Sequence, residues 1–194
     1  MTVAAAGPTH DVETLPLVLQ LVAATYQAPR QALLRDLDRG AIAEAIARVA
    51  DALELAAPAL PDADPTTLQS AHVDLFVSSA RGRTAPPYVG YALDGELLGP
   101  SAEAVGRFLA SHGIGTDPAW RDLPDHVAAV AEAASILSVT GQHHAAERVA
   151  REWLLPWFDR YATEVATKDV SDFYGPLTTF LHAAIREVTR GDRS

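Results

Sequence analysis

The sequence predicts an all-α fold, a single-domain helical bundle of about eight helices with one long mid-chain loop. Its apolar residues recur at helical rather than alternating spacing, and alanine dominates the small positions. Hydrophobic residues make up 48% of the chain and charged residues 21%, so the chain can bury a core. A length of 194 residues fits one domain of ordinary size. We therefore expect a single domain over residues 1–194.

The N-terminal third predicts three helices, after a segment 1–13 that is expected to be flexible. A threonine cap favours a helix over 14–26, and a proline at the first helical position favours a second over 29–37. A third helix is expected over 41–57. Its apolar positions share one face, because they are spaced i, i+4, i+7 and i+11: Ile42, Ile46, Val49 and Leu53.

Two irregular segments follow. Three prolines make the stretch 58–65 a connector, because they fix φ and disfavour helix in the residues before them. A helix is expected from near Thr66. Residues 79–100 then lose helical periodicity and are rich in glycine and proline. Loops of this length in a compact domain are usually functional or mobile, so 79–100 is the first place to look for a site.

The C-terminal half predicts four more helices. Ser101 can cap a helix over 101–112, and the next is expected over 124–141. Another begins near Gln142 and is expected to kink at Pro156. The last is expected from about Ser171, with its apolar residues on one side: Phe173, Leu177, Phe180, Leu181, Ala184 and Val188.

Composition excludes several classes of function. The 25 acidic and 15 basic residues give a formal net charge of -10, which disfavours nucleic acid and anionic lipid and favours a cationic partner. The absence of cysteine excludes thiolate catalysis and cysteine-ligated metals. No apolar run approaches the roughly 20 residues that span a bilayer. The N-terminus does not have the pattern of a secretory signal. We therefore expect a cytoplasmic protein without stable membrane insertion.

Common enzyme signatures are missing, so we expect neither catalysis nor a cofactor or metal. Asp125 and His126 form the one acid and imidazole pair at a predicted helix start. They could act as acid and base, but neighbours on a helix point about 100° apart. Alternatively, Asp125 stabilises the helix start and His126 is a neutral surface residue. Tyr88, which lies in the irregular loop, could line a groove or simply anchor that loop.

Several segments in a fixed order resemble the TorD/DmsD/NarJ family of redox-enzyme maturation chaperones over about residues 15–190. These segments include Ala71 to Phe76, then Pro86, Pro87 and Tyr88 with Asp94-Gly95 and Leu98-Gly99-Pro100, and then Leu123, Pro124, Asp125 and His126. The resemblance implies an all-helical chaperone without catalytic turnover. Such a protein binds the catalytic subunit of a molybdopterin oxidoreductase, often through its twin-arginine leader peptide, until the cofactor is inserted before export.

The resemblance also implies peptide-binding residues. In the family the Pro-Asp-His stretch is associated with leader binding, which implies this role for Asp125 and His126. The aromatic loop implies the same role for Tyr88, with Pro86 and Pro87 beside it. The chain departs from the family pattern after Tyr88, where Val89 and Gly90 replace a common Glu-Ser pair. This departure predicts a divergent client protein.

A binding scheme follows as a hypothesis. Asp125 and Glu132 are two helical turns apart and would share one side of a helix, where they could meet two arginines. Tyr88, Tyr91 and Leu93 would contact an apolar stretch of the leader. The alternatives are a NarJ-like assembly factor that binds the mature subunit without its leader, and a small-ligand-binding all-α protein or enzyme. The expected oligomeric state is a monomer or a domain-swapped dimer.

Overall fold

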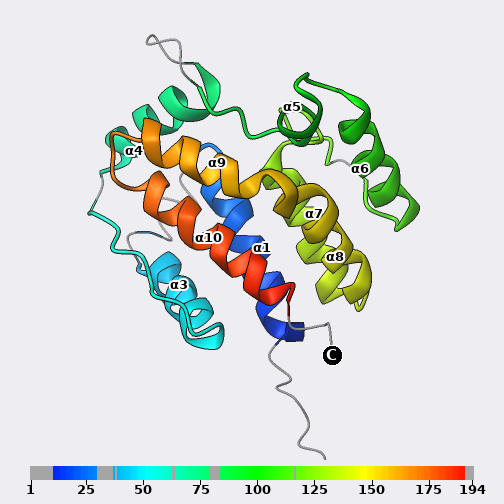
Figure 1. Cartoon of the computed structure of the whole chain (residues 1–194), viewed down its shortest axis with the longest axis horizontal. Helices are drawn as coiled ribbons and strands as arrows, with labels where there is room; N and C mark the ends of the chain where they lie inside the picture. Colours follow the sequence, from blue (N-terminus) through cyan, green and yellow to red (C-terminus); the bar gives the residue numbers. More distant parts are fainter. Residues whose placement is uncertain are drawn as a thin grey trace, which may run out of the picture.

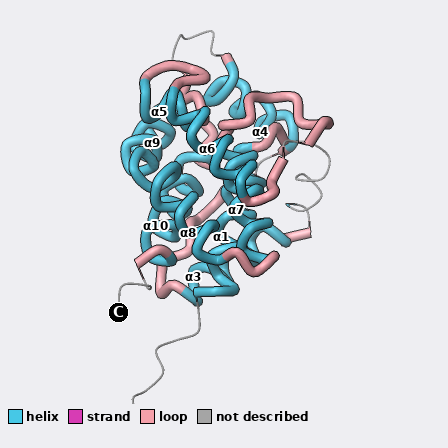
Figure 2. Tube along the Cα trace, turned by 90° about the vertical axis from the view of Figure 1, so that its right-hand side faces the viewer, coloured by secondary structure: helices cyan, strands magenta, loops and turns pink. Residues whose placement is uncertain are grey.

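The chain folds into a bundle of helices, and Figures 1 and 2 show a computed structural model of it. The part of the chain that the structure describes holds helices, turns and one isolated antiparallel bridge, between Tyr88 and His126, and has no β-strand. The all-α prediction is therefore confirmed. The described residues are 11–29, 37, 39–62, 64–78, 84–115 and 117–190.

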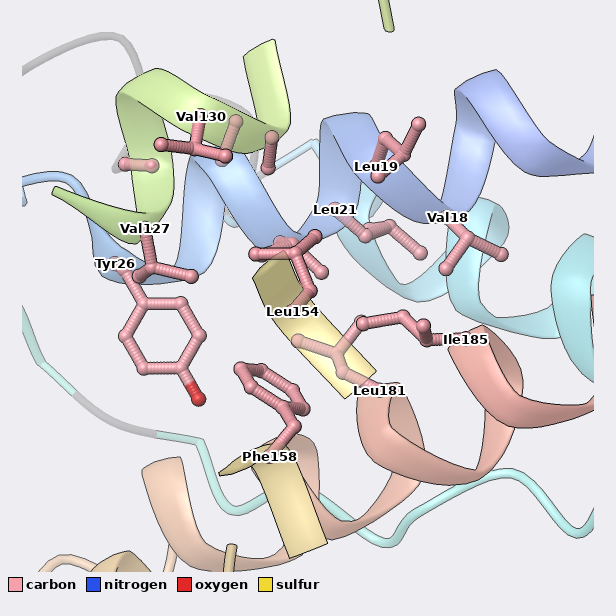
Figure 3. Packing of buried hydrophobic residues seen from close by; sticks show 14 of the residues in the cluster. Val18, Leu19, Leu21, Tyr26, Val127, Val130, Leu154, Phe158, Leu181 and Ile185 are labelled. Atoms are coloured by element: carbon pink, nitrogen blue, oxygen red, sulfur yellow. The ribbon is translucent and has the colours of Figure 1, made fainter. Parts of the chain in front are cut away.

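The centre of the bundle is the contact between α1 (Asp11–Tyr26) and α7 (Val127–Val139), the most extensive contact between two helices. Both helices are apolar on nearly every side, which is the pattern of helices enclosed by others. Helix α10 (Tyr174–Val188) packs against α1, and α9 (Leu155–Lys168) pairs with α10. Figure 3 shows side chains from all of these helices meeting in one core.

Tyr26 anchors that core at the C-terminal end of α1. Its side chain is fully buried, and its hydroxyl forms a 2.7 Å hydrogen bond with the hydroxyl of Thr178 on α10. Its ring makes edge or tilted contacts with the rings of Phe76, Phe158 and Tyr161, with centroids 5.3 to 6.1 Å apart. Such contacts add to the free energy of burial, so Tyr26 ties α1 to three other elements.

The remaining elements surround this centre. Two of them are π-helical turns that continue an α-helix. The elements are α3 (Ala41–Ala52), α4 (Pro65–His72), η1 (Val73–Val77), α5 (Val89–Asp94), α6 (Pro100–Ser111), α8 (His143–Val149) and η2 (Ala150–Leu154). Pro156, where a kink is expected, occupies the first turn of α9, directly after η2.

Three predicted boundaries near the middle of the chain need correction. The helix predicted over 41–57 ends at Ala52, because the chain turns at Glu54, whose φ is 54°. The predicted loop 79–100 contains the short helix α5, which has too few residues to show a helical period. The helix predicted from 124 begins at Val127, after His126.

Other predictions concern where helices begin and end. Asp11, Val12 and Glu13 are helical, so the first helix begins three residues before the predicted start at residue 14. Most of the helix predicted over 29–37 lies outside the described residues. Gly99, not Ser101, occupies the cap position of α6, and the last helix begins at Tyr174. In the described part of the chain, no helix is long and apolar enough to cross a membrane.

Close packing of α10 against α9 predicts opposite effects of alanine at two glycines. A Cβ at Gly175 would lie 3.0 Å from the Cα of Ala166, whereas a Cβ at Gly106 on α6 meets nothing within 4 Å. Gly175→Ala should lower the free energy of unfolding by about 1–3 kcal/mol. Gly106→Ala should raise it by about 0.5–1 kcal/mol, because alanine favours helix. Urea denaturation measures both, and equal effects would contradict the close approach.

Candidate binding pocket

A cavity of about 530 Å³ opens between the C-terminal end of α1, the α4–η1 helix, α6 and α7. Tyr26, His72 and Phe76 contribute to its lining from the core. The ring nitrogen Nε2 of His72 lies 3.2 Å from the backbone oxygen of Tyr26, so His72 is a buried histidine hydrogen-bonded to the end of α1. The size suits a small ligand or one short segment of peptide.

An extended strap, residues 84–88, lies beside the cavity and leads into α5. The backbone N–H of Ala85 donates to the oxygen of Leu75 at 2.6 Å, and the hydroxyl of Tyr161 donates to the oxygen of Ala85 at 3.0 Å. The ammonium of Lys168 donates to the oxygen of Thr84 at 2.6 Å. These three bonds, to η1 and α9, fix where the strap places Tyr88.

The same strap and the start of α5 pair with the residues that begin α7. The N–H of Val127 donates to the oxygen of Pro87 at 2.7 Å, and the N–H of Val89 donates to the backbone oxygen of Asp125 at 3.1 Å. The N–H of Gly90 donates to Oδ2 of Asp125 at 3.0 Å. This pairing brings Tyr88 and His126, which are far apart in the sequence, to the same wall of the cavity.

Asp125 is buried behind the wall of the cavity. Its side chain is 1% exposed and does not line the cavity, and no partner is present for its Oδ1 among the described residues. It precedes α7 rather than lying on it, so the predicted pairing of Asp125 and Glu132 on one helix face is wrong. Asp125 accepts the first N–H groups of α5 and so connects that helix to the start of α7.

His126 caps α7 and faces the cavity. Its Nδ1 accepts a 3.1 Å hydrogen bond from the N–H of Ala128, so the proton of the neutral ring is on Nε2. The ring is 5% exposed, and this burial lowers its pKa to about 4, although Asp122 acts in the opposite direction. The interpretation of His126 as a surface residue is therefore wrong, because it is buried and neutral at pH 7.

Tyr88 and Trp120 flank the imidazole of His126 and complete an aromatic wall. Their ring centroids lie 5.3 and 5.7 Å from that of His126, both in edge-on arrangements. The hydroxyl of Tyr88 donates to Oδ1 of Asp122 at 2.9 Å, and the indole N–H of Trp120 donates to the oxygen of Leu123 at 3.1 Å. Tyr88 thus lines the cavity, as one of its two interpretations predicted.

Charges and apolar side chains are unevenly distributed around the cavity. Asp117, Asp122 and Glu132 line it, against a single cation, Arg121, among the described lining residues. Val77 and Ile136 also line it and are 66% and 42% exposed, so they form an apolar rim. The cavity therefore suits a ligand that carries positive charge beside apolar groups.

The other predicted site residues do not line the cavity. Pro87 is buried and Pro86 half-buried in the strap, where they shape its path rather than contact a ligand in the cavity. Tyr91 projects from α5 and is 45% exposed. Conversely, Trp120 and Asp122 line the cavity but were missed, because they lie in a turn that has no periodicity. The described residues include no group of acidic or histidine side chains that could hold a metal ion.

The sequence profile of the nitrate reductase delta subunit family matches residues 36–163, about two thirds of the chain. The chain belongs to this family. The match includes the strap, the aromatic wall and α7, and it confirms the resemblance to redox-enzyme maturation chaperones that the motifs indicated.

A solved structure supports the fold of this delta subunit family member. It is a crystal structure of a candidate redox enzyme maturation protein from Archaeoglobus fulgidus, with 20% sequence identity and a TM-score of 0.59. The alignment covers 93% of this chain and 96% of the other. No curated protein matches the chain.

The buried carboxylate of Asp125 predicts a loss of stability when it is removed. Asp125→Ala leaves the N–H of Gly90 without its partner, so it should lower the free energy of unfolding by about 1–3 kcal/mol. Asp122→Asn, at an exposed position, should change it by less than about 0.5 kcal/mol. Chemical denaturation of both variants measures the difference. Equal stability of Asp125→Ala and the wild type would contradict the supporting role.

The depressed pKa of His126 predicts a pH dependence of stability. Between pH 6.5 and 4 the unfolded state binds a proton at this residue that the folded state does not, so stability falls as pH falls. The loss should reach about 3 kcal/mol by pH 4. His126→Asn keeps a capping side chain but cannot titrate, so it should lose less stability over this range. If the wild type and His126→Asn lose the same free energy of unfolding as the pH falls, the burial of His126 is contradicted.

Proposed function

We propose that this protein is a maturation chaperone for the catalytic subunit of a molybdopterin oxidoreductase. It holds a basic and apolar segment of that subunit, its twin-arginine leader peptide, while the cofactor is inserted and before the enzyme is exported. The observation that carries this proposal is an acidic cavity with an aromatic wall and an apolar rim in a member of the delta subunit family. The proposed location is the cytoplasm, where such a client is assembled.

Asp122 and Glu132 are the carboxylates that suit an arginine of the leader. Both are exposed and line the cavity. Oδ1 of Asp122 accepts from Tyr88 and Leu123, whereas none of the described residues donates to its Oδ2. A guanidinium could bond to this oxygen and lie against the indole of Trp120, because planar cations pack well on aromatic faces. Asp122 therefore takes the role that the sequence assigned to Asp125.

The apolar part of the leader would lie along the rim. Ile136 is one helical turn beyond Glu132 on α7, and Val77 also lines the cavity from η1. A segment with its arginines at the acids can therefore extend its apolar residues over the rim. Exposed ion pairs contribute only about 0.2–1 kcal/mol each, so the apolar contact must provide most of the affinity.

His126 favours binding over catalysis. A histidine with a pKa of about 4 is a weak base at pH 7, which makes the acid and base alternative less suitable. Its Nε2–H has no acceptor among the described residues, and its ring lines the cavity. This group can donate to a backbone oxygen of a bound peptide, which would fix the peptide without reacting with it.

A second mode of action is that of an assembly factor that holds the mature part of the subunit without recognising its leader. The two modes are compatible, because the leader occupies one cavity and leaves other surfaces accessible. They differ in one result: a mature-subunit contact predicts binding to a client whose leader has been deleted.

Neutralising the two acids should weaken leader binding in a salt-dependent way. The double variant Asp122→Asn with Glu132→Gln should bind a synthetic peptide of the client's leader about 3- to 10-fold more weakly at low salt, with a smaller difference at high salt. Glu44→Gln removes an exposed carboxylate on the remote helix α3 and serves as the matched control. Isothermal calorimetry measures the affinities. Equal affinity of the double variant and the control would exclude the cavity acids as the arginine site.

Affinity capture from the native cytoplasm identifies the client. A tagged wild-type chain should retain a molybdopterin oxidoreductase catalytic subunit, identified by mass spectrometry, and the double variant should retain less of it. Recovery of no such subunit from cells that make these enzymes would contradict the proposed function.

A further inference from the structure

Exposed apolar side chains gather on α5 and the turn that follows it, away from the cavity. Tyr91, Leu93, Leu97 and Leu98 are 45%, 37%, 53% and 58% exposed, and none lines the cavity. We call residues 91–98 the α5–α6 knob. Single exposed apolar residues need no explanation, but a group within eight residues is typical of an interaction surface.

The knob is held in one conformation by bonds at both ends. The carboxylate of Asp94 accepts from the N–H and the hydroxyl of Ser101, both at 2.7 Å, so the chain closes on itself before α6. Gly99 fits against that carboxylate, because a Cβ there would lie 2.6 Å from Oδ2 of Asp94. Arg160 on α9 donates to the oxygen of Ala92 at 2.8 Å. The knob is therefore preorganised for contact.

Leu98 adopts a backbone conformation that is unfavourable for a leucine. Its φ is 59°, in the left-handed region that glycine occupies at least cost, and Gly95 in the same turn has a φ of 82°. With more than half of its surface exposed, the leucine side chain contributes little to the core. A leucine at a position suited to glycine indicates that its side chain is used outside the fold.

We propose that the α5–α6 knob is a second contact with the client and inserts into an apolar concavity on the folded catalytic subunit. This inference rests on the proposed function. The turn lies at the edge of the molecule in Figure 1, and a projecting apolar turn needs a concave partner, which a short leader peptide does not offer. Residues 91–98 include Asp94 and Glu96 and no basic residue, so the concavity should be bordered by basic groups. The same two acids disfavour an anionic lipid surface.

A pair of glycine substitutions tests the proposal. Leu98→Gly removes the side chain and relaxes the backbone at once, so the variant should unfold no more than a few degrees below the wild type. Glu54→Gly makes the same change of backbone preference at a φ of 54°, at the end of α3, which Figures 1 and 2 place at the opposite end of the bundle from α5. The probe is the purified catalytic subunit identified by affinity capture, expressed without its leader.

The wild type and Glu54→Gly should bind this leaderless subunit equally, and Leu98→Gly should bind it about five-fold more weakly or worse. All three should bind the leader peptide equally. If both variants bind the leaderless subunit equally, the proposed role of the knob is wrong. It is also wrong if the wild type binds the subunit only when the leader is present, but that result would not contradict the proposed leader site. A wild type that binds neither form contradicts the proposed function itself. Loss of a dimer of the chain alone in Leu98→Gly, seen by light scattering, would assign the knob to self-association instead.

Discussion

The site depends on the pairing between the residues around Asp125 and the strap that leads into α5. Three hydrogen bonds between backbone and side-chain groups make this pairing, and all of their residues lie in the interior, where an unmade hydrogen bond is costly. The pairing sets the start of α7, the start of α5 and the position of Tyr88 together. One buried carboxylate thus organises a wall of the cavity and also fixes the helix that carries the knob. The aspartate of the Pro-Asp-His motif is better explained by this structural task than by contact with a ligand.

Burial also determines the chemistry of the cavity. His126 and His72 both have a lowered pKa, mainly because burial disfavours the charged imidazole, so both are neutral at pH 7. The acids at the mouth, Asp117, Asp122 and Glu132, are exposed and face a single cation, Arg121, among the described lining residues. The result is a neutral aromatic interior below a negative opening. Such a cavity attracts a cation to its mouth and accepts apolar groups along its rim, which is the order of groups in a basic and apolar peptide.

The sequence predicts the helices well where the helical period is long, and less well where position depends on contacts distant in the chain. The face of Ile46 and Val49 and the start of a helix near Thr66 are local, so pattern and turn chemistry suffice for them. Asp125 is different: whether a carboxylate at a helix start is exposed or buried depends on the strap, which lies some forty residues earlier. Trp120 belongs to a turn without periodicity, and only the folded chain shows that its ring lies beside His126.

The strap has one further property, which follows from the bond between Lys168 and Thr84. Lys168 is the only lysine in the chain, so its ammonium is the single side-chain amine, and it is 19% exposed while it holds the strap and pairs with Glu164. An amine-selective reagent therefore has one internal target, and the rate of its reaction reports how often the strap leaves α9. Covalent labelling can follow that opening in the whole protein, with a reporter that the chain already contains.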